Sequence, residues 1–144
     1  MNRFDLATRL QDMKPIENIR TGGCSCGAVR FVARGEPLRV GLCHCLRCRK
    51  AHASAFYPFA VFRPDQVEVT GAVESWFSSP PYDDRFCPVC GSRVIAVLDG
   101  EVELSLGSLD EPGELTPQYE SWIIRREPWL PALDVPQFER DRIP

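Results

Sequence analysis

The chain has 144 residues, 44% of them hydrophobic and 26% charged, with a formal net charge of −3. This is the size and composition of one globular domain that can bury a core without cross-links. The weakly acidic balance argues against broad nucleic-acid binding, which requires cations against the phosphates, and no apolar run approaches the length of a membrane span. The first residues lack an apolar core, so we expect no secretory signal and a cytoplasmic location.

The predicted elements begin with a short N-terminal segment. Apolar residues recur at helical spacing over residues 4–13, and Pro15 limits any helix there. We therefore expect a short helix or arm over residues 1–18, followed by one domain over residues 19–142.

From residue 20 onward, short alternating segments are separated by turn residues, a pattern typical of a mainly β domain. The expected strands cover residues 28–33, 38–42, 61–63, 66–70, 74–77, 93–98, 102–106 and 119–124. Turns or loops are expected at residues 22–27, 78–84 and 107–113, and Asp99-Gly100 indicates a hairpin turn. Residues 127–144 show no clear period.

The cysteines fall into groups of two, three and two along the chain. The groups are Cys24 and Cys26, then Cys43, Cys45 and Cys48, then Cys87 and Cys90. Such close spacings suit a metal better than disulfides, which are rare in the cytoplasm, and soft thiolates favour zinc. The two pairs together supply four sulfurs, which close a tetrahedron, whereas the trio leaves one coordination position open. The simplest division is therefore a closed structural zinc on the two pairs and an open zinc on Cys43, Cys45 and Cys48.

Several alternatives stay open at this point. The seven thiols could be buried free cysteines with a redox-active CxxC pair. His52 follows Cys48 by four residues and could complete a closed Cys₃His site, in which case both zincs would be structural. His44 would point to the other face of an extended segment, so we expect a partly exposed side chain or a hydrogen-bond donor near the metal.

Three cations, Arg47, Arg49 and Lys50, lie within or directly after the trio. Their charge favours thiolate over thiol. They could also hold the carboxylates of a substrate, or simply form a solvated face.

The cysteine motifs closely resemble those of the glutathione-dependent formaldehyde-activating enzyme (GFA) family, also called the centromere-protein-V-like family. The matching segments are residues 22–31, 43–50 and 86–92, with residues 107–110 and Trp129 in addition. The resemblance covers residues 19–142. It implies a mainly β fold of the Mss4-like type, stabilised by zinc.

The resemblance also implies a carbon–sulfur lyase type of activity, the reversible joining of glutathione and formaldehyde into S-hydroxymethylglutathione. Carried over to this chain, it gives the structural zinc to Cys24, Cys26, Cys87 and Cys90 and the catalytic zinc to Cys43, Cys45 and Cys48. We therefore expect two Zn²⁺ ions and a small-molecule thiol as partner, with no nucleic acid and no membrane. Assembly into a homo-oligomer is left open.

The chain departs from the family pattern at two places. His52 and Ala53 stand where many relatives have a small hydroxyl residue and a glycine, and Glu120 stands where many have a histidine. We expect His52 to lie near the open metal without binding it, with a pKa near neutral that lets it move protons or contact a substrate. The main competing function is a non-catalytic binding module scaffolded by two closed zincs.

Overall fold

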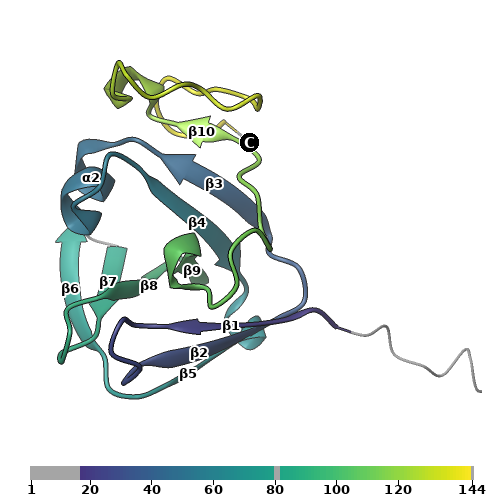
Figure 1. The fold of residues 1–144 in the computed structure, drawn as a ribbon, viewed down its shortest axis with the longest axis vertical. Helices are drawn as coiled ribbons and strands as arrows, with labels where there is room; N and C mark the ends of the chain where they lie inside the picture. The colour runs from purple at the N-terminus through teal and green to yellow at the C-terminus, as the bar shows by residue number, and fades with distance from the viewer. Residues whose placement is uncertain (1–16, 80–81, 144) are drawn as a thin grey trace, which may run out of the picture.

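The computed structural model describes residues 17–79 and 82–143, and over these residues the chain folds into two β-sheets with short helices (Figure 1). The smaller sheet contains, side by side, β1 (Ile19–Gly23), β2 (Arg30–Arg34) and β5 (Val67–Thr70). The larger sheet contains, in spatial order, β10 (Glu120–Ser121), β3 (Arg39–Cys43), β4 (Tyr57–Phe62), β9 (Glu101–Ser105), β8 (Arg93–Leu98), β7 (Tyr82–Phe86) and β6 (Glu74–Ser79). Within residues 17–79 and 82–143 the helices are α2 (Leu46–His52) and three 3₁₀ turns, η1 (Pro64–Gln66), η2 (Leu106–Ser108) and η3 (Ile123–Arg125). The prediction of a mainly β domain is confirmed.

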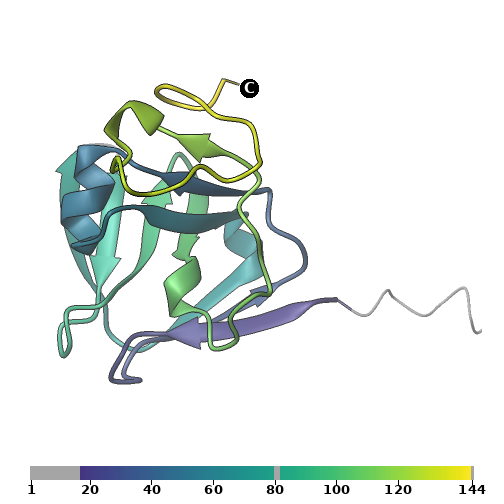
Figure 2. The same ribbon diagram turned by 45° about the horizontal axis from the view of Figure 1, so that its top comes forward.

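Neighbouring strands are antiparallel except at one edge of the larger sheet, where β10 runs parallel to β3. After β10 the chain loops round and runs parallel beside it: the N–H of Glu120 donates to the carbonyl of Pro136, and the N–H of Phe138 donates to the carbonyl of Glu120. Figure 2 shows this last segment, in yellow, lying over the end of the molecule that carries β3 and β10. The C-terminal residues thus cover the strand that leads into the central cysteines.

The side chains of β4 alternate between two hydrophobic clusters on opposite faces of the larger sheet, as the two-residue period of a strand requires. Ala60 and Phe62 join the cluster that lies between the two sheets. The other cluster receives Tyr57, Phe59 and Val61. Cys43 and Cys48 belong to this second cluster, so the central cysteines lie on the face that points away from the smaller sheet.

Residues 82–84, expected in a loop, belong to β7, and residues 46–52, for which no helix was expected, form α2. The strand was missed because its polar sequence buries a carboxylate: Asp84 is 1% exposed and pairs with Arg47 and Arg93. The helix was missed because its cap is unusual. The sulfur of Cys45 accepts the backbone N–H of Cys48, which is the task that a serine or asparagine oxygen normally performs.

Other expected elements need smaller corrections. The strand expected at 119–124 is limited to Glu120–Ser121, after which η3 begins. Residues 57–60, which were not assigned to a strand, extend β4 at its start, and residues 93–98 form β8 as expected. The helix expected within residues 4–13 lies outside the described residues. In the part of the chain that the structure describes, no helix is long and apolar enough to cross a membrane.

Candidate functional site

The two cysteine pairs meet between the β1–β2 turn and the β7–β8 turn. The sulfurs of Cys24, Cys26, Cys87 and Cys90 all lie within 4.8 Å of one another. The sulfur of Cys26 is 3.6 Å from that of Cys24 and 3.8 Å from that of Cys87. Zn–S bonds of about 2.3 Å in a tetrahedron place sulfurs about 3.8 Å apart. The four sulfurs therefore fit one four-coordinate zinc that ties the smaller sheet to the larger one.

Local backbone geometry supports this first cluster. Gly27 and Gly91, which directly follow Cys26 and Cys90, have φ angles of 82° and 77°, a conformation that glycine adopts without strain. The N–H of Val29 donates to the sulfur of Cys24 at 3.2 Å, and this hydrogen bond is the main cause that lowers the pKa of Cys24. The turn thus favours the thiolate form that binds metal.

The trio comes from one short stretch at the junction of β3 and α2. Cys43 ends β3, Cys45 caps α2, and Cys48 lies in the first turn of that helix. Their sulfurs lie within 4.8 Å of one another. Two of them accept backbone N–H groups: Cys43 from residue 45 at 3.4 Å, and Cys45 from residue 48 at 3.3 Å.

The protonation of the trio indicates that it needs a cation. Hydrogen bonds from Cys43 and Cys48 lower the pKa of Cys45 to about 2, so this sulfur is the thiolate of the group. The thiolate at Cys45 raises the pKa of Cys43 to about 11, and the two other sulfurs raise the pKa of Cys48. Without a metal, one negative charge therefore suppresses the other two. A divalent cation is what would let all three sulfurs ionise together, and soft sulfur donors at these separations suit zinc.

Two cavities meet at the trio. The first, of about 200 Å³, is called here the Glu103 cavity; it is lined by Arg39, Cys43, Arg47, Cys48, Tyr57, Phe59, Tyr82, Leu98, Glu103, Tyr119, Ser121, Asp141 and Arg142. The second, of about 370 Å³, is called the Trp122 cavity; it is lined by Cys43, Cys45, Leu46, Arg47, Cys48, Tyr82, Trp122, Arg125 and Asp141. Both are bounded by Cys43 and Cys48, so the trio is accessible from two sides. The sequence motifs gave no signal for Glu103, Tyr82 or Asp141, because these residues reach the trio only through the tertiary fold.

Glu103 is the most perturbed carboxyl group near the trio. Burial raises the pKa of Glu103 to about 7, although the hydrogen bond from the hydroxyl of Tyr57 and the charge of Arg47 act in the opposite direction. Burial also raises the pKa of Tyr57 well above its ordinary value, so this hydroxyl stays protonated and donates. A carboxyl group that gains and loses a proton near neutral pH thus faces the cavity beside Cys43 and Cys48.

The cations of the trio motif are held within the fold to different degrees. Arg47 Nη2 lies 2.5 Å from Oδ2 of the buried Asp84. Arg49 pairs with Glu127, whereas Lys50 is exposed. The two arginines therefore have structural partners, and the expectation that Arg49 holds a substrate carboxylate gains no support from its position.

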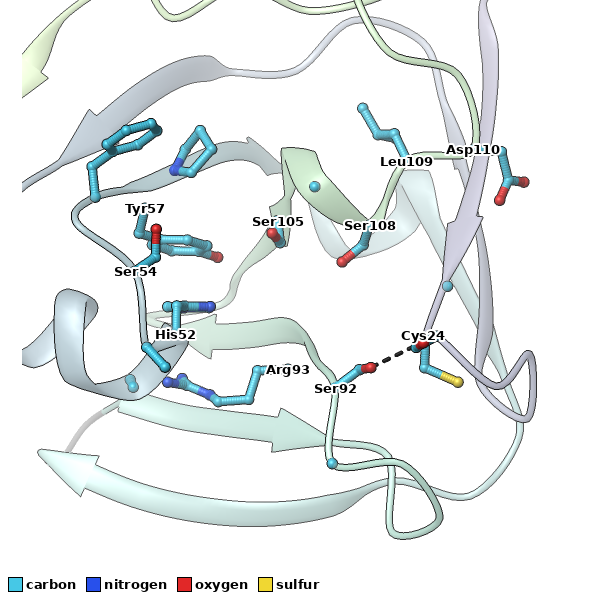
Figure 3. Close-up of a pocket in the computed structure, with 18 of the residues that line it drawn as sticks. Cys24, His52, Ser54, Tyr57, Ser92, Arg93, Ser105, Ser108, Leu109 and Asp110 are labelled. Carbon is cyan, nitrogen blue, oxygen red and sulfur yellow. Dashed lines mark hydrogen bonds between the residues drawn. The ribbon is translucent and has the colours of Figure 1, made fainter.

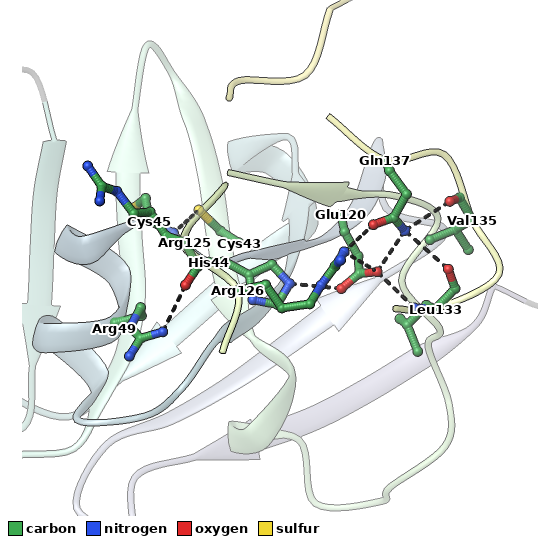
Figure 4. A network of polar contacts seen from close by, with 10 residues as sticks. All are labelled: Cys43, His44, Cys45, Arg49, Glu120, Arg125, Arg126, Leu133, Val135 and Gln137. Carbon is green, nitrogen blue, oxygen red and sulfur yellow. Dashed lines mark hydrogen bonds and ion pairs between the residues drawn. The ribbon is translucent and has the colours of Figure 1, made fainter. Parts of the chain in front are cut away.

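His44 is fully buried, so the expectation of a partly exposed side chain was wrong. Its Nε2 lies 2.8 Å from Oε1 of Glu120, on the neighbouring strand β10 (Figure 4). Glu120 also accepts from the backbone N–H of Leu133 at 2.8 Å, from Nε2 of Gln137 at 2.7 Å and from Nη2 of Arg126 at 3.1 Å. Burial alone would raise the pKa of Glu120, but these donors lower it. The buried carboxylate thus anchors the backbone of the trio to the C-terminal segment.

His52 is not among the side chains close enough to share an ion with the trio. Its ring stacks on Tyr57, with centroids 3.8 Å apart, and Figure 3 shows it between that ring and Arg93. The expected near-neutral pKa was wrong: burial, and next the charge of Arg93, lower the pKa of His52 to about 4. A neutral imidazole at physiological pH does not serve there as a proton donor.

His52 instead lines a third cavity, of about 860 Å³, between the end of α2 and the first cysteine cluster. Its described lining includes Cys24 and several hydroxyl groups, among them Ser54 and Ser105, but none of the trio cysteines. This cavity is therefore separate from the two that reach the trio.

Fold and site together define a mainly β domain with a four-cysteine cluster and an accessible three-cysteine cluster, both suited to zinc. The family model described as "Glutathione-dependent formaldehyde-activating enzyme" matches residues 19–125, and the chain belongs to this family. Among curated proteins, no sequence matches the chain.

Proposed function

We propose that the protein is a zinc-dependent enzyme of the carbon–sulfur lyase type that acts on a thiol adduct such as S-hydroxymethylglutathione. The observation that carries the proposal is the trio: three sulfurs rather than four, placed where two cavities meet. A set of three protein ligands leaves a zinc position open, as catalytic sites require. Membership of the family supports a glutathione-related small molecule as substrate.

The two clusters take different roles in this proposal. Cys24, Cys26, Cys87 and Cys90 would hold a structural zinc, because they join two sheets and supply all four ligands. Cys43, Cys45 and Cys48 would hold the catalytic zinc, whose positive charge stabilises a substrate thiolate. Three thiolate ligands already carry negative charge, so this zinc would be a weak Lewis acid, and side chains in the cavities must supply the remaining polar contacts.

The placement of two arginines fits a tripeptide thiol. Glutathione carries its thiol between two carboxylate ends. Arg142 lines the Glu103 cavity and Arg125 lines the Trp122 cavity, and both side chains are exposed. With the thiol at the trio, each carboxylate end would lie on the side of one arginine, where charge-assisted hydrogen bonds can form. Asp141 borders both cavities and could accept the ammonium group.

The test must separate catalysis from the spontaneous reaction of glutathione with formaldehyde. Two-dimensional ¹³C exchange spectroscopy on an equilibrium mixture of labelled formaldehyde and glutathione gives the rate constants of adduct formation and breakdown directly. We expect the zinc-loaded protein to raise both rate constants, and Cys45→Ser to abolish the acceleration. A protein that contains two zincs per chain and leaves both rate constants unchanged would refute the proposal and favour the binding module.

A further inference from the structure

Glu103 is a half-buried acid that has no role in binding the thiol or the carboxylates of the proposed substrate. It lies on β9 and accepts the hydroxyl of Tyr57, a residue of β4 that stands directly opposite Cys43 in the β3–β4 pairing. Glu103, Cys43 and Cys48 line the same cavity. A carboxyl group therefore borders the cavity into which a thiol adduct at the trio would extend.

The proposed reaction requires a group that moves a proton at this place. An S-hydroxymethyl adduct breaks down only when the proton of its hydroxyl group is removed, and in the reverse direction the new oxyanion must be protonated. The trio sulfurs cannot do this while they hold a metal. His52 is poorly suited, because its pKa of about 4 makes it a weak base and it lines a different cavity.

The other titratable groups of the Glu103 cavity are less suited. Burial raises the pKa of Tyr82 to about 12 and also raises the pKa of Tyr119, so both keep their protons near neutral pH. Asp141 is exposed and accepts the indole N–H of Trp122 at 2.9 Å. The arginines of the cavity do not release protons.

The charges around Glu103 come from several elements. Burial is the largest influence on its pKa and raises it to about 7; Arg47 of α2 and Arg39 of β3 oppose this rise, and Asp84 of β7 adds to it. The titratable neighbours are Tyr57 of β4, Tyr82 of β7 and Tyr119, which precedes β10. Opposing cations keep the shift moderate, so both the acid and the carboxylate are populated at the pH of a cell.

We propose that Glu103 is the acid–base residue of the trio site, a role that rests on the proposed function. In breakdown, the Glu103 carboxylate takes the hydroxyl proton of the adduct, the electron pair of the O–H bond forms the C=O bond of formaldehyde, and the C–S bond breaks with its pair left on sulfur. The products are formaldehyde, the thiolate and the Glu103 acid, which returns its proton to water. In formation, the acid protonates the oxyanion as the thiolate adds to formaldehyde, so no oxidant or reductant is needed.

The experiment compares Glu103→Gln with Glu68→Gln in the zinc-loaded protein. Glu68 is exposed on β5 of the smaller sheet and lines neither trio cavity, so its variant should keep the wild-type rates. General acid–base groups contribute about 10²- to 10⁴-fold. We expect Glu103→Gln to lower the enzymatic breakdown rate constant by that factor while zinc content and glutathione affinity stay unchanged.

The pH dependence supplies a readout that a structural role would not change. Because the carboxylate is the active form in breakdown, the wild-type rate constant should rise with pH around 7 and then level off. The rate constant of Glu103→Gln should not show this pH-dependent rise. Glu103→Asp, which retains a carboxyl group, should keep the pH-dependent rise. Independently of turnover, ¹³C NMR of labelled glutamate side chains should show one carboxyl that titrates near pH 7 and is missing in Glu103→Gln.

The outcomes separate the two proposals. A wild type that does not accelerate breakdown refutes the proposed function and this role with it. If the wild type is active and Glu103→Gln keeps both its rate constant and its rise with pH, only the role of Glu103 is refuted. The same holds if the carboxyl of Glu103 titrates in the ordinary range of glutamates.

Discussion

Glu120 offers a sharp test of how the C-terminal segment supports the trio. The carboxylate is 1% exposed and accepts hydrogen bonds from Leu133, Gln137 and Arg126, besides its contact with His44. Glu120→Ala removes the acceptor and leaves a fully buried histidine and a largely buried arginine without it. Breaking a buried charged pair in this way costs about 3–5 kcal/mol.

The expected effect is large enough to measure by two methods. In a domain of this size, 1 kcal/mol lowers Tm by about 2–4 °C, so Glu120→Ala should lower Tm by roughly 6–20 °C on the same scale. Urea unfolding should show a matching loss of free energy. Asp65→Ala provides the control: it breaks the exposed pair of Asp65 with Arg63, whose side chains are 74% and 55% exposed, and such pairs contribute below about 1 kcal/mol.

The zinc content of Glu120→Ala extends the test to the site. Since His44 is bound to Glu120 and lies between two trio cysteines, the variant should lose the metal of the trio more readily to a chelator than wild type does. If Glu120→Ala unfolds within 1 kcal/mol of wild type and keeps its metal equally well, the network does not support the trio and the reasoning is refuted.

Three further predictions concern the cysteine clusters and His52. Cys87→Ser removes a fully buried ligand that joins the two sheets, so it should lower Tm and soluble yield sharply; an unchanged melting curve would count against a structural metal there. Cys45→Ser should keep most of the stability but reduce bound zinc from two to one per chain by elemental analysis, and equal damage from both variants would contradict the proposed division. His52→Ala should keep both zincs, because His52 lies outside the trio cluster, and loss of the second zinc would show that it is a ligand after all.

The cysteine clusters could be predicted from the sequence because metal ligands are constrained locally. The trio lies within six residues, and its metal-binding geometry follows from a strand end and a helix cap. The two pairs are far apart in the chain, yet each lies in a tight turn, and four sulfurs complete a tetrahedron. Counting ligands was therefore enough to group them, and the structure brings the same sulfurs together.

The surroundings of the trio could not be predicted in this way because they depend on burial. Asp84 and Glu120 look like ordinary surface acids in the sequence, but both are 1% exposed, Asp84 beside Arg47 of α2 and Glu120 beside His44 of the trio stretch. The spacing of His52 from Cys48 would allow it to bind the same metal. In the fold, however, its ring stacks on Tyr57 and burial lowers its pKa to about 4. In each case a contact that forms only in the folded chain decides the chemistry.

The two parts of the site therefore have different origins in the chain, and this has a consequence for function. The three ligands come from residues 43–48, so the capacity to hold the metal depends on one local motif. The cavity walls come from distant strands and from the C-terminal segment, through residues such as Glu103, Trp122 and Arg142. If the proposed function holds, substitutions in the walls should change the adduct that is accepted without disturbing the three cysteines. Under the proposed function, the trio would define the type of chemistry, and the walls would determine which thiol adduct undergoes it.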